Sequence, residues 1–289
     1  MYIIRDPDNL NLRFYEGYDH NFLWNKVEAL YLIIENPDKF RSLISDAGGN
    51  PDDIKDKYFE TLRAHIHFSE FQQFEAFLAL IIAVFQPLAH WLYLTSYTTK
   101  EIKEKAQALL DSNAVNFSNG LFTNMNEALD EAVYLGFRSD NPAVSEKWET
   151  NIDNLRWMLQ RMAYKYLNYN EYNSYKHGLR IMTGSTYFSF RLNNAPESGL
   201  TFSSDDSIRY LEIEKLQDGS RQVREVFQHF NPLESLSHMD FMCTMLENIK
   251  NVRLARIKGE EHAGLKTLTN LEKDKLTALM KRTKWSLTV

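Results

Sequence analysis

The chain has 289 residues, of which 44% are hydrophobic and 25% are charged, and this composition excludes a globally disordered protein. Its single cysteine, Cys243, excludes an internal disulfide and a cysteine-based zinc cluster, and favours a reducing, cytoplasmic compartment. The net charge is −6 and uneven: ten Lys or Arg against four Asp or Glu in residues 250–284 give +6, so the remaining residues carry −12.

The first part of the chain shows the apolar spacing of helices. We predict one helix over residues 21–34, a short second helix that follows it and ends near residue 45, and a long third helix over residues 51–85. Residues 1–18 show no clear period. The second half of the long helix is apolar on nearly all sides, which predicts a central position in the fold. Glu75 interrupts this apolar surface, and a buried carboxylate is normally paired or protonated.

The apolar run over residues 77–94 is close to the lower limit for crossing a bilayer. It contains Gln86, Pro87 and His90, so it predicts a buried helix broken at Pro87 rather than a membrane span. The N-terminal residues also lack the basic segment and apolar run of a signal peptide.

A further helix is expected after Pro87, ending near residue 97. Three more helices are expected over residues 98–110, 124–135 and 143–177. The pattern then alternates, which predicts strands near residues 187–192, 208–215 and 222–230, with a hairpin turn at Asp218-Gly219 and a long polar loop over 193–206. Helical spacing returns from Asn231-Pro232 to residue 258 and again over 270–284.

These patterns predict a mainly α-helical bundle with a small antiparallel sheet inserted at about residues 185–230. The whole chain, residues 1–289, would form a single helical domain. The helices of residues 231–289 would pack on the bundle.

One polar stretch does not fit simple packing. The apolar face of the helix over 143–177 continues into Asn173 and His177, and Lys176 and Arg180 lie beside them. One interpretation is a helix C-terminus, where Lys176 and His177 favour the negative end of the dipole and Gly178 supplies the cap. The other is a catalytic site: His177 as acid or base, Lys176 and Arg180 as anion contacts, and Asn173 as an orienting amide.

Nucleic acid is a candidate partner of this site and of two further groups. The row beside the apolar face carries Arg161, Lys165 and Tyr172, whose charges and ring suit phosphates and bases. The basic segment contains Arg253, Arg256 and Lys258, which could equally be a solvated helix face. Because both long helices carry an interrupted apolar face, we also predict that Glu75 meets Asn173, Lys176, His177 or Arg180, directly or through one water.

The motif Asn173-x-x-Lys176-His177-Gly178, late in a long helix, resembles the HEPN-type helical proteins of prokaryotes. The resemblance implies a metal-independent ribonuclease of bacterial defence, often a homodimer with the site at the shared interface. The usual signature has an Arg four to six residues before the His, whereas the nearest upstream Arg here is Arg161, sixteen residues before His177. Some HEPN-like proteins are non-catalytic binders of nucleic acid or protein.

No phosphate-binding glycine loop, G-x-S-x-G motif or H-E-x-x-H motif is present, so the sequence predicts no cofactor and no metal. Two functions therefore remain open. One is a HEPN-like nucleic-acid-binding protein that cleaves RNA. The other is a non-enzymatic helical interaction or structural protein in which Lys176-His177-Gly178 is only a helix cap.

Overall fold

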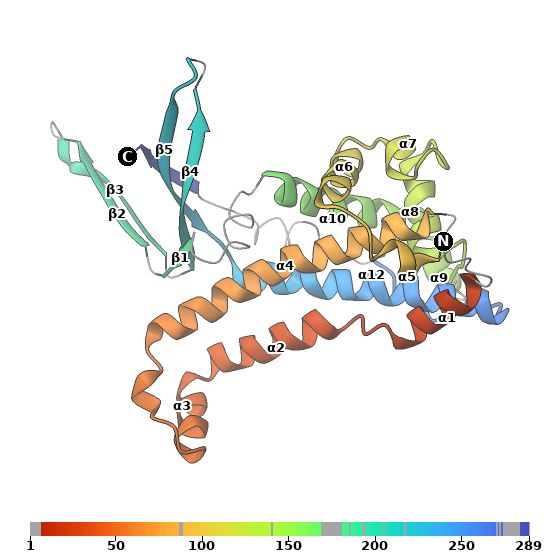
Figure 1. Cartoon of the computed structure of the whole chain (residues 1–289), viewed down its shortest axis with the longest axis horizontal. Coiled ribbons are helices and arrows are strands. Elements are labelled where there is room, and N and C mark those ends of the chain that lie inside the picture. The colour runs from red at the N-terminus through yellow and green to blue at the C-terminus, as the bar shows by residue number, and fades with distance from the viewer. Residues whose placement is uncertain are drawn as a thin grey trace. The chain divides into compact units, whose positions relative to one another are not determined.

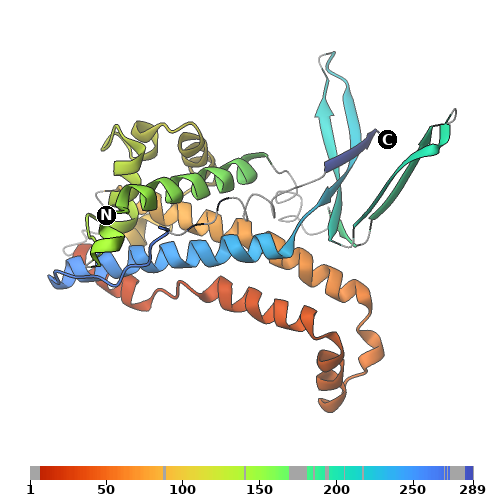
Figure 2. The ribbon, with the colours of Figure 1, turned by 180° about the vertical axis from the view of Figure 1, so that it is seen from behind.

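The computed structural model describes residues 7–86, 89–139, 141–168, 181–184, 186–192, 195–204, 206–216, 218–269, 271, 273 and 284–288. In these residues helices predominate and the strands form small antiparallel sheets, so the fold is mainly α with a sheet insertion, as the sequence predicts (Figures 1 and 2). The chain divides into two units: one comprises Met1–Trp24, Phe71–Tyr169 and His238–Glu272, and the other comprises Asn25–Glu70, Asn170–Ser237 and Lys273–Val289.

The described helices are α1 (Pro7–Gly17), α2 (Phe22–Glu35), α3 (Pro37–Asp46), the 3-10 turn η1 (Pro51–Asp53), α4 (Asp56–Val84), α5 (His90–Tyr93), α6 (Thr99–Leu110), α7 (Ala114–Phe117), α8 (Met125–Tyr134), α9 (Pro142–Ser145), α10 (Trp148–Asn168) and α12 (Pro232–Lys258). The described strands are β1 (Ile181–Thr183), β2 (Thr186–Leu192), β3 (Ala195–Ser204), β4 (Ser207–Lys215), β5 (Arg221–His229) and β6 (Lys284–Thr288). Both α4 and α12 contribute residues to each unit.

The core of the first unit lies between the second half of α4, helix α10 and most of α12, which run side by side in Figures 1 and 2. The residues predicted to form this core are all buried: Phe71, Leu78, Ile82, Leu159, Met162 and Tyr166. Helix α12 contributes a largely methionine face that is also buried: Met239, Met242, Met245, Leu246, Ile249 and Val252. The central position predicted for α4 is therefore confirmed within this unit.

Local signals explain where several helices begin and end. Thr98 and Glu101 form a reciprocal capping box at the start of α6. At the end of α8, Leu135 adopts a left-handed conformation with φ of 50°, and Gly136 follows with φ of 75°. The Asn231 side chain accepts the backbone N–H of Leu233 at 3.0 Å and so caps the start of α12.

In the second unit, four antiparallel strands pair in the order β1-β4-β5-β6, and β2 pairs separately with β3. The β4–β5 register runs from Ser207 opposite His229 to Lys215 opposite Arg221. The predicted Asp218-Gly219 turn closes this hairpin: Gly219 has φ of 84°.

Three expectations differ from the structure. Residues 195–204 form strand β3 and not a polar loop, because Leu200 and Phe202 alternate with polar residues and lie opposite Phe190 and Phe188 of β2. Residues 7–17 form α1, which opens with a proline and an early acid, Asp8. Most of the helix expected over 270–284 lies outside the described residues, but Lys284 opens strand β6.

Candidate functional site

The predicted polar stretch lies outside the described residues, since Tyr172, Asn173, Lys176, His177 and Arg180 all fall within 169–180. Its contact with Glu75 therefore stays a prediction. The structure does describe the rest of the residues proposed for the site.

Glu75 is half-buried on α4 and faces α10. The Tyr166 hydroxyl donates a hydrogen bond to Glu75 Oε1 at 2.6 Å. Burial, and then the hydrogen bond to the Glu75 carboxylate, raise the pKa of Tyr166 well above its ordinary value. The interruption of the apolar face by Glu75 is thus accommodated by a phenol–carboxylate pair between the two helices.

Two cations of the row beside the apolar face, Arg161 and Lys165, lie against aromatic rings. The Arg161 guanidinium lies 4.9 Å from the centroid of the Trp157 ring. Lys165 is only 5% exposed, and its ammonium lies 5.5 Å from the centroid of the Phe71 ring. The proposal that Lys165 contacts nucleic acid is corrected by this burial, because a phosphate cannot reach a side chain inside the core.

The basic end of α12 is largely engaged within the protein. Arg253 is buried and donates through Nη2 to the carbonyl oxygens of Glu131 and Ala132, both at 3.1 Å. These carbonyls belong to the last turn of α8, where the helix dipole favours a cation. Arg253 is therefore not a surface contact for nucleic acid, as the sequence had suggested, but a buried cap of α8.

The two neighbouring cations are exposed and paired more weakly. Arg256 donates to the carbonyl of Leu135 at 3.4 Å and lies over the Phe137 ring. Lys258 forms an ion pair with Glu16 at 3.2 Å. Neither residue belongs to an uncompensated basic patch in the part of the chain that the structure describes.

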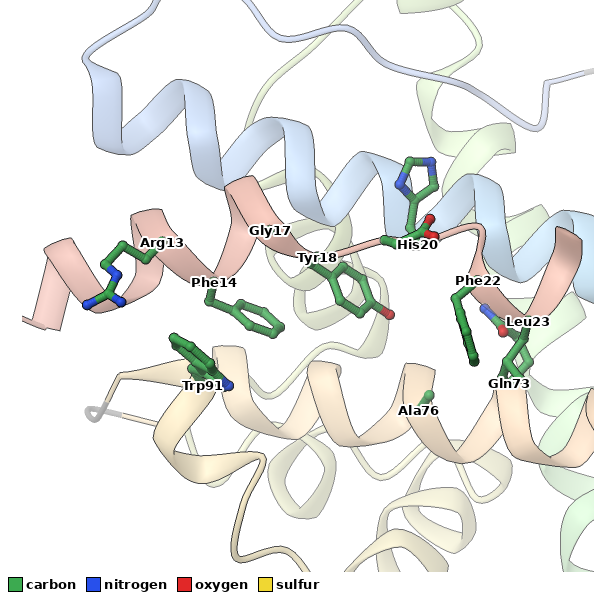
Figure 3. Close-up of a pocket in the computed structure, with 11 residues that line it drawn as sticks. Arg13, Phe14, Gly17, Tyr18, His20, Phe22, Leu23, Gln73, Ala76 and Trp91 are labelled. Atoms are coloured by element: carbon green, nitrogen blue, oxygen red, sulfur yellow. The ribbon is translucent and has the colours of Figure 1, made fainter. Parts of the chain in front are cut away.

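An aromatic pocket opens beside α1 in the first unit and encloses about 570 Å³ (Figure 3). Its walls come from α1, the turn after it, the start of α2, α4 and α5. The lining residues are Arg13, Phe14, Gly17, Tyr18, Asp19, His20, Phe22, Leu23, Gln73, Ala76 and Trp91. A pocket of this size that is lined mainly by aromatic and apolar side chains is the usual form of a small-ligand site.

The rings of this aromatic pocket are only partly covered. Phe14 stacks on Tyr18 with centroids 5.3 Å apart and lies 6.3 Å from Trp91. Trp91 is 45% exposed and Phe22 is 68% exposed. Figure 3 shows Tyr18 and Phe22 on either side of a space above Ala76, whose small side chain leaves the floor open.

Polar groups stand at the edges of the aromatic pocket. Arg13 is exposed and has no ion-pair partner among the described residues. His20 points away from the rings towards α12 (Figure 3), where its Nε2 lies 3.8 Å from Glu247. Burial raises the pKa of Tyr18 to about 12, so the hydroxyl at the pocket stays protonated at neutral pH.

The thiol of Cys243 lies behind the same wall and donates to the carbonyl of His20 at 3.3 Å. Burial raises its pKa to about 12, so this thiol is not a ready nucleophile. Cys243 is a free cysteine that packs as a small buried side chain.

The sequence carried a signal for the aromatic pocket that the prediction missed. Phe14, Tyr18 and Phe22 form a run of closely spaced aromatic residues across the end of α1 and the start of α2. Trp91 could not be added from the sequence, because it reaches the pocket only through the packing of α5 on α1.

A buried polar cluster in the second unit was also missed. Ser235 donates to Glu70 Oε2 at 2.7 Å, and its oxygen lies 3.4 Å from His67 Nδ1. All three residues are at most 2% exposed. His67 Nδ1 also lies 4.0 Å from Glu70 Oε2, so the same ring nitrogen faces both the serine and the acid. A hydrolase triad uses the two different ring nitrogens for these contacts, so the arrangement differs from a triad. The cluster ties α4 to α12 within this unit.

Among the described residues no three His, Cys, Asp or Glu side chains are grouped to hold a metal ion. None of the described helices is long and apolar enough to cross a membrane. No family model matches the chain, and the comparisons with curated proteins and with solved structures likewise give no match.

Proposed function

We propose that this protein binds single-stranded nucleic acid, with an unpaired base stacked in the aromatic pocket. The observation that carries the proposal is the group of partly exposed rings, Phe14, Tyr18, Phe22 and Trp91, around an open space. Every base has a flat π-face, so such rings bind single strands with little regard to sequence. Arg13 stands at the edge of this pocket as a cation for a phosphate.

The resemblance to HEPN-type proteins extends the proposal to RNA as the strand and to a defence role in the bacterial cytoplasm. It also adds metal-independent cleavage, with His177 as the acid–base group. This part is tested by incubating labelled RNA with the protein in EDTA. We expect cleavage by the wild-type chain and none by His177→Ala. Equal cleavage by both would contradict the role of His177, and no cleavage by either would leave a binding protein.

Binding itself is tested by fluorescence anisotropy with a labelled single-stranded RNA. Loss of one stacking ring costs about 1–3 kcal/mol, so Trp91→Ala and Phe22→Ala should each weaken binding about 5- to 150-fold. Ala76→Leu should weaken it as well, because the added side chain fills the floor without removing a ring. Leu121→Ala, at a residue that is 62% exposed and outside the pocket, is the matched control and should bind as the wild type does.

The second candidate function is a protein–protein contact through the same exposed rings. The net charge of −6 favours it, since an acidic protein repels phosphate at long range. The salt dependence of the affinity distinguishes the two candidate functions. Binding of nucleic acid weakens steeply with added salt, whereas an apolar protein–protein contact does not. RNA affinity that is unchanged in Trp91→Ala and Phe22→Ala would remove the first candidate.

A further inference from the structure

A segment without helix or sheet pairing, residues 262–268, is held on the first unit by the side-chain amides of asparagines. On α12, Asn248 accepts the backbone N–H of Lys266 at 2.9 Å and donates to the carbonyl of the same residue at 2.8 Å. One turn further, Asn251 donates to the carbonyl of Gly264 at 3.0 Å. A two-bond pairing of this kind satisfies both backbone groups of one residue, as a neighbouring strand would.

Helix α10 supplies the other half of the contact. Asn151 accepts the backbone N–H of Leu268 at 2.7 Å, and Asn154 donates to the carbonyl of Leu268 at 2.6 Å. The Tyr134 hydroxyl also donates to Asn151 Oδ1, at 3.3 Å, and helps to fix that amide. We call the surface formed by Asn151, Asn154, Asn248 and Asn251 the asparagine groove.

The bonds fall on alternate residues, Gly264, Lys266 and Leu268. Backbone groups of alternate residues point to the same side only in an extended chain, so the groove matches the period of a β-strand. All five bonds go to main-chain atoms, which every residue other than proline offers. The four asparagines therefore contact an extended backbone, whatever its side chains are.

The bound segment is not anchored by a core. No residue from 261 to 269 is fully buried, and Lys266 and Gly264 are exposed. A hydrogen bond of this type contributes about 0.5–1.5 kcal/mol net, and segments held mainly by such bonds can open locally without global unfolding. The groove itself is rigid, because Asn151 and Asn248 are fully buried on long helices.

The segment also leaves part of the groove unused. The buried Asn151 Nδ2 has no hydrogen-bond partner among the described residues. A buried donor without a partner is costly. The chain's own segment is therefore an incomplete occupant of this surface.

We propose that the asparagine groove is a binding site for an extended peptide of a partner protein, and that residues 262–268 occupy it as an internal competitor. The site requires backbone N–H groups at the positions of Lys266 and Leu268, so it rejects proline there. The groove favours a cation at the position of Lys266, because Lys266 Nζ lies 2.6 Å from the Glu247 carboxylate. It tolerates other residues at Gly264, where an added Cβ would lie at an ordinary 3.8 Å from Asn251.

The test uses a fluorescent peptide with the sequence of residues 262–269 and the full-length protein. Lys266→Pro in the chain removes one donor of the internal segment and leaves the groove intact. We expect this variant to bind the peptide at least tenfold more tightly than the wild type, because a larger fraction of its grooves is open. Adding Asn248→Ala to Lys266→Pro should abolish the binding, and a peptide with proline at the Lys266 position should not bind.

Equal peptide affinity in the wild type and Lys266→Pro, or binding that survives Asn248→Ala, would overturn the proposal. Hydrogen exchange on the unmodified protein gives a second, independent measurement. The amides of Lys266 and Leu268 should exchange through local opening, faster than the amides of the middle of α12. Exchange of both groups at the same slow rate would mean that the segment is a fixed part of the core, and it would overturn the proposal without any variant.

Discussion

At the scale of single residues, His90 is held in its neutral form. The Tyr15 hydroxyl, which is fully buried, lies 2.7 Å from His90 Nδ1, and the His90 backbone N–H donates to the Asn11 side chain at 2.7 Å. Burial, and then the nearby charge of Arg253, lower the pKa of His90 to about 4. The imidazole beside the Tyr15 hydroxyl therefore remains uncharged at neutral pH.

This arrangement predicts a loss of stability in acid. In the unfolded chain His90 takes up a proton near pH 6.5, whereas in the folded chain it takes one up only near pH 4. The free energy of unfolding therefore decreases as the pH falls from about 6.5 towards 4. The loss from this group should reach about 3 kcal/mol, measured as the free energy of unfolding by urea at each pH. His90→Gln should flatten the curve in this window.

Leu121→Ala, at an exposed residue that does not titrate, supplies the control and should keep the wild-type dependence on pH. Parallel curves for the wild type and His90→Gln would contradict the assignment.

At the scale of elements, α12 holds the C-terminal end of α8 through two arginines. Arg253 makes two buried bonds to carbonyls of α8, while Arg256 makes one longer bond from an exposed position. Arg253→Ala should lower the free energy of unfolding by about 2–4 kcal/mol, because it removes two charge-assisted bonds and leaves the Ala132 carbonyl without this donor. Arg256→Ala should cost less than about 1 kcal/mol. Similar losses for both variants in urea titrations would argue against the buried cap.

The elements that the sequence predicted are those with local signals. The capping box at Thr98 and Glu101, the proline at the start of α12 and the Asp218-Gly219 turn each act within a few residues, so they can be recognised in the sequence. Strand β3 was missed because its polar composition resembles a loop, and only its pairing with β2 distinguishes the two.

The sites were predicted less well for a different reason. The basic residues near 253 could be counted, but the count does not reveal that Arg253 meets the end of a helix about 120 residues earlier, at Glu131 and Ala132. The asparagine groove joins Asn151 to Leu268 in the same way. Neither pairing leaves a periodic pattern in the sequence, because the amino acids involved are ordinary and only tertiary packing brings them together.

At the scale of the whole molecule, the net charge is −6, and the described cations at the end of α12, Arg253, Arg256 and Lys258, have partners within the protein. If single-stranded RNA binds in the aromatic pocket, the double variant Arg256→Ala/Lys258→Ala should leave the salt dependence of binding nearly unchanged. Arg13→Ala should reduce the slope of log affinity against log salt by about 0.7, the value for one phosphate contact on a single strand. A slope that falls in the double variant and not in Arg13→Ala would indicate that nucleic acid binds at the end of α12 and not in the aromatic pocket.

The pairing of β6 with β5 has a consequence for how the protein is made. Arg224 of β5 pairs with Thr288 of β6, so 288 − 224 = 64 residues must be added after Arg224 before this side of the sheet can close. At the usual speed of the ribosome this takes roughly 3–13 s, during which β5 presents unpaired N–H and C=O groups along one side. A nascent chain stalled or cut before Lys284 would keep this exposed edge permanently, and such chains should aggregate by strand addition where the finished protein does not.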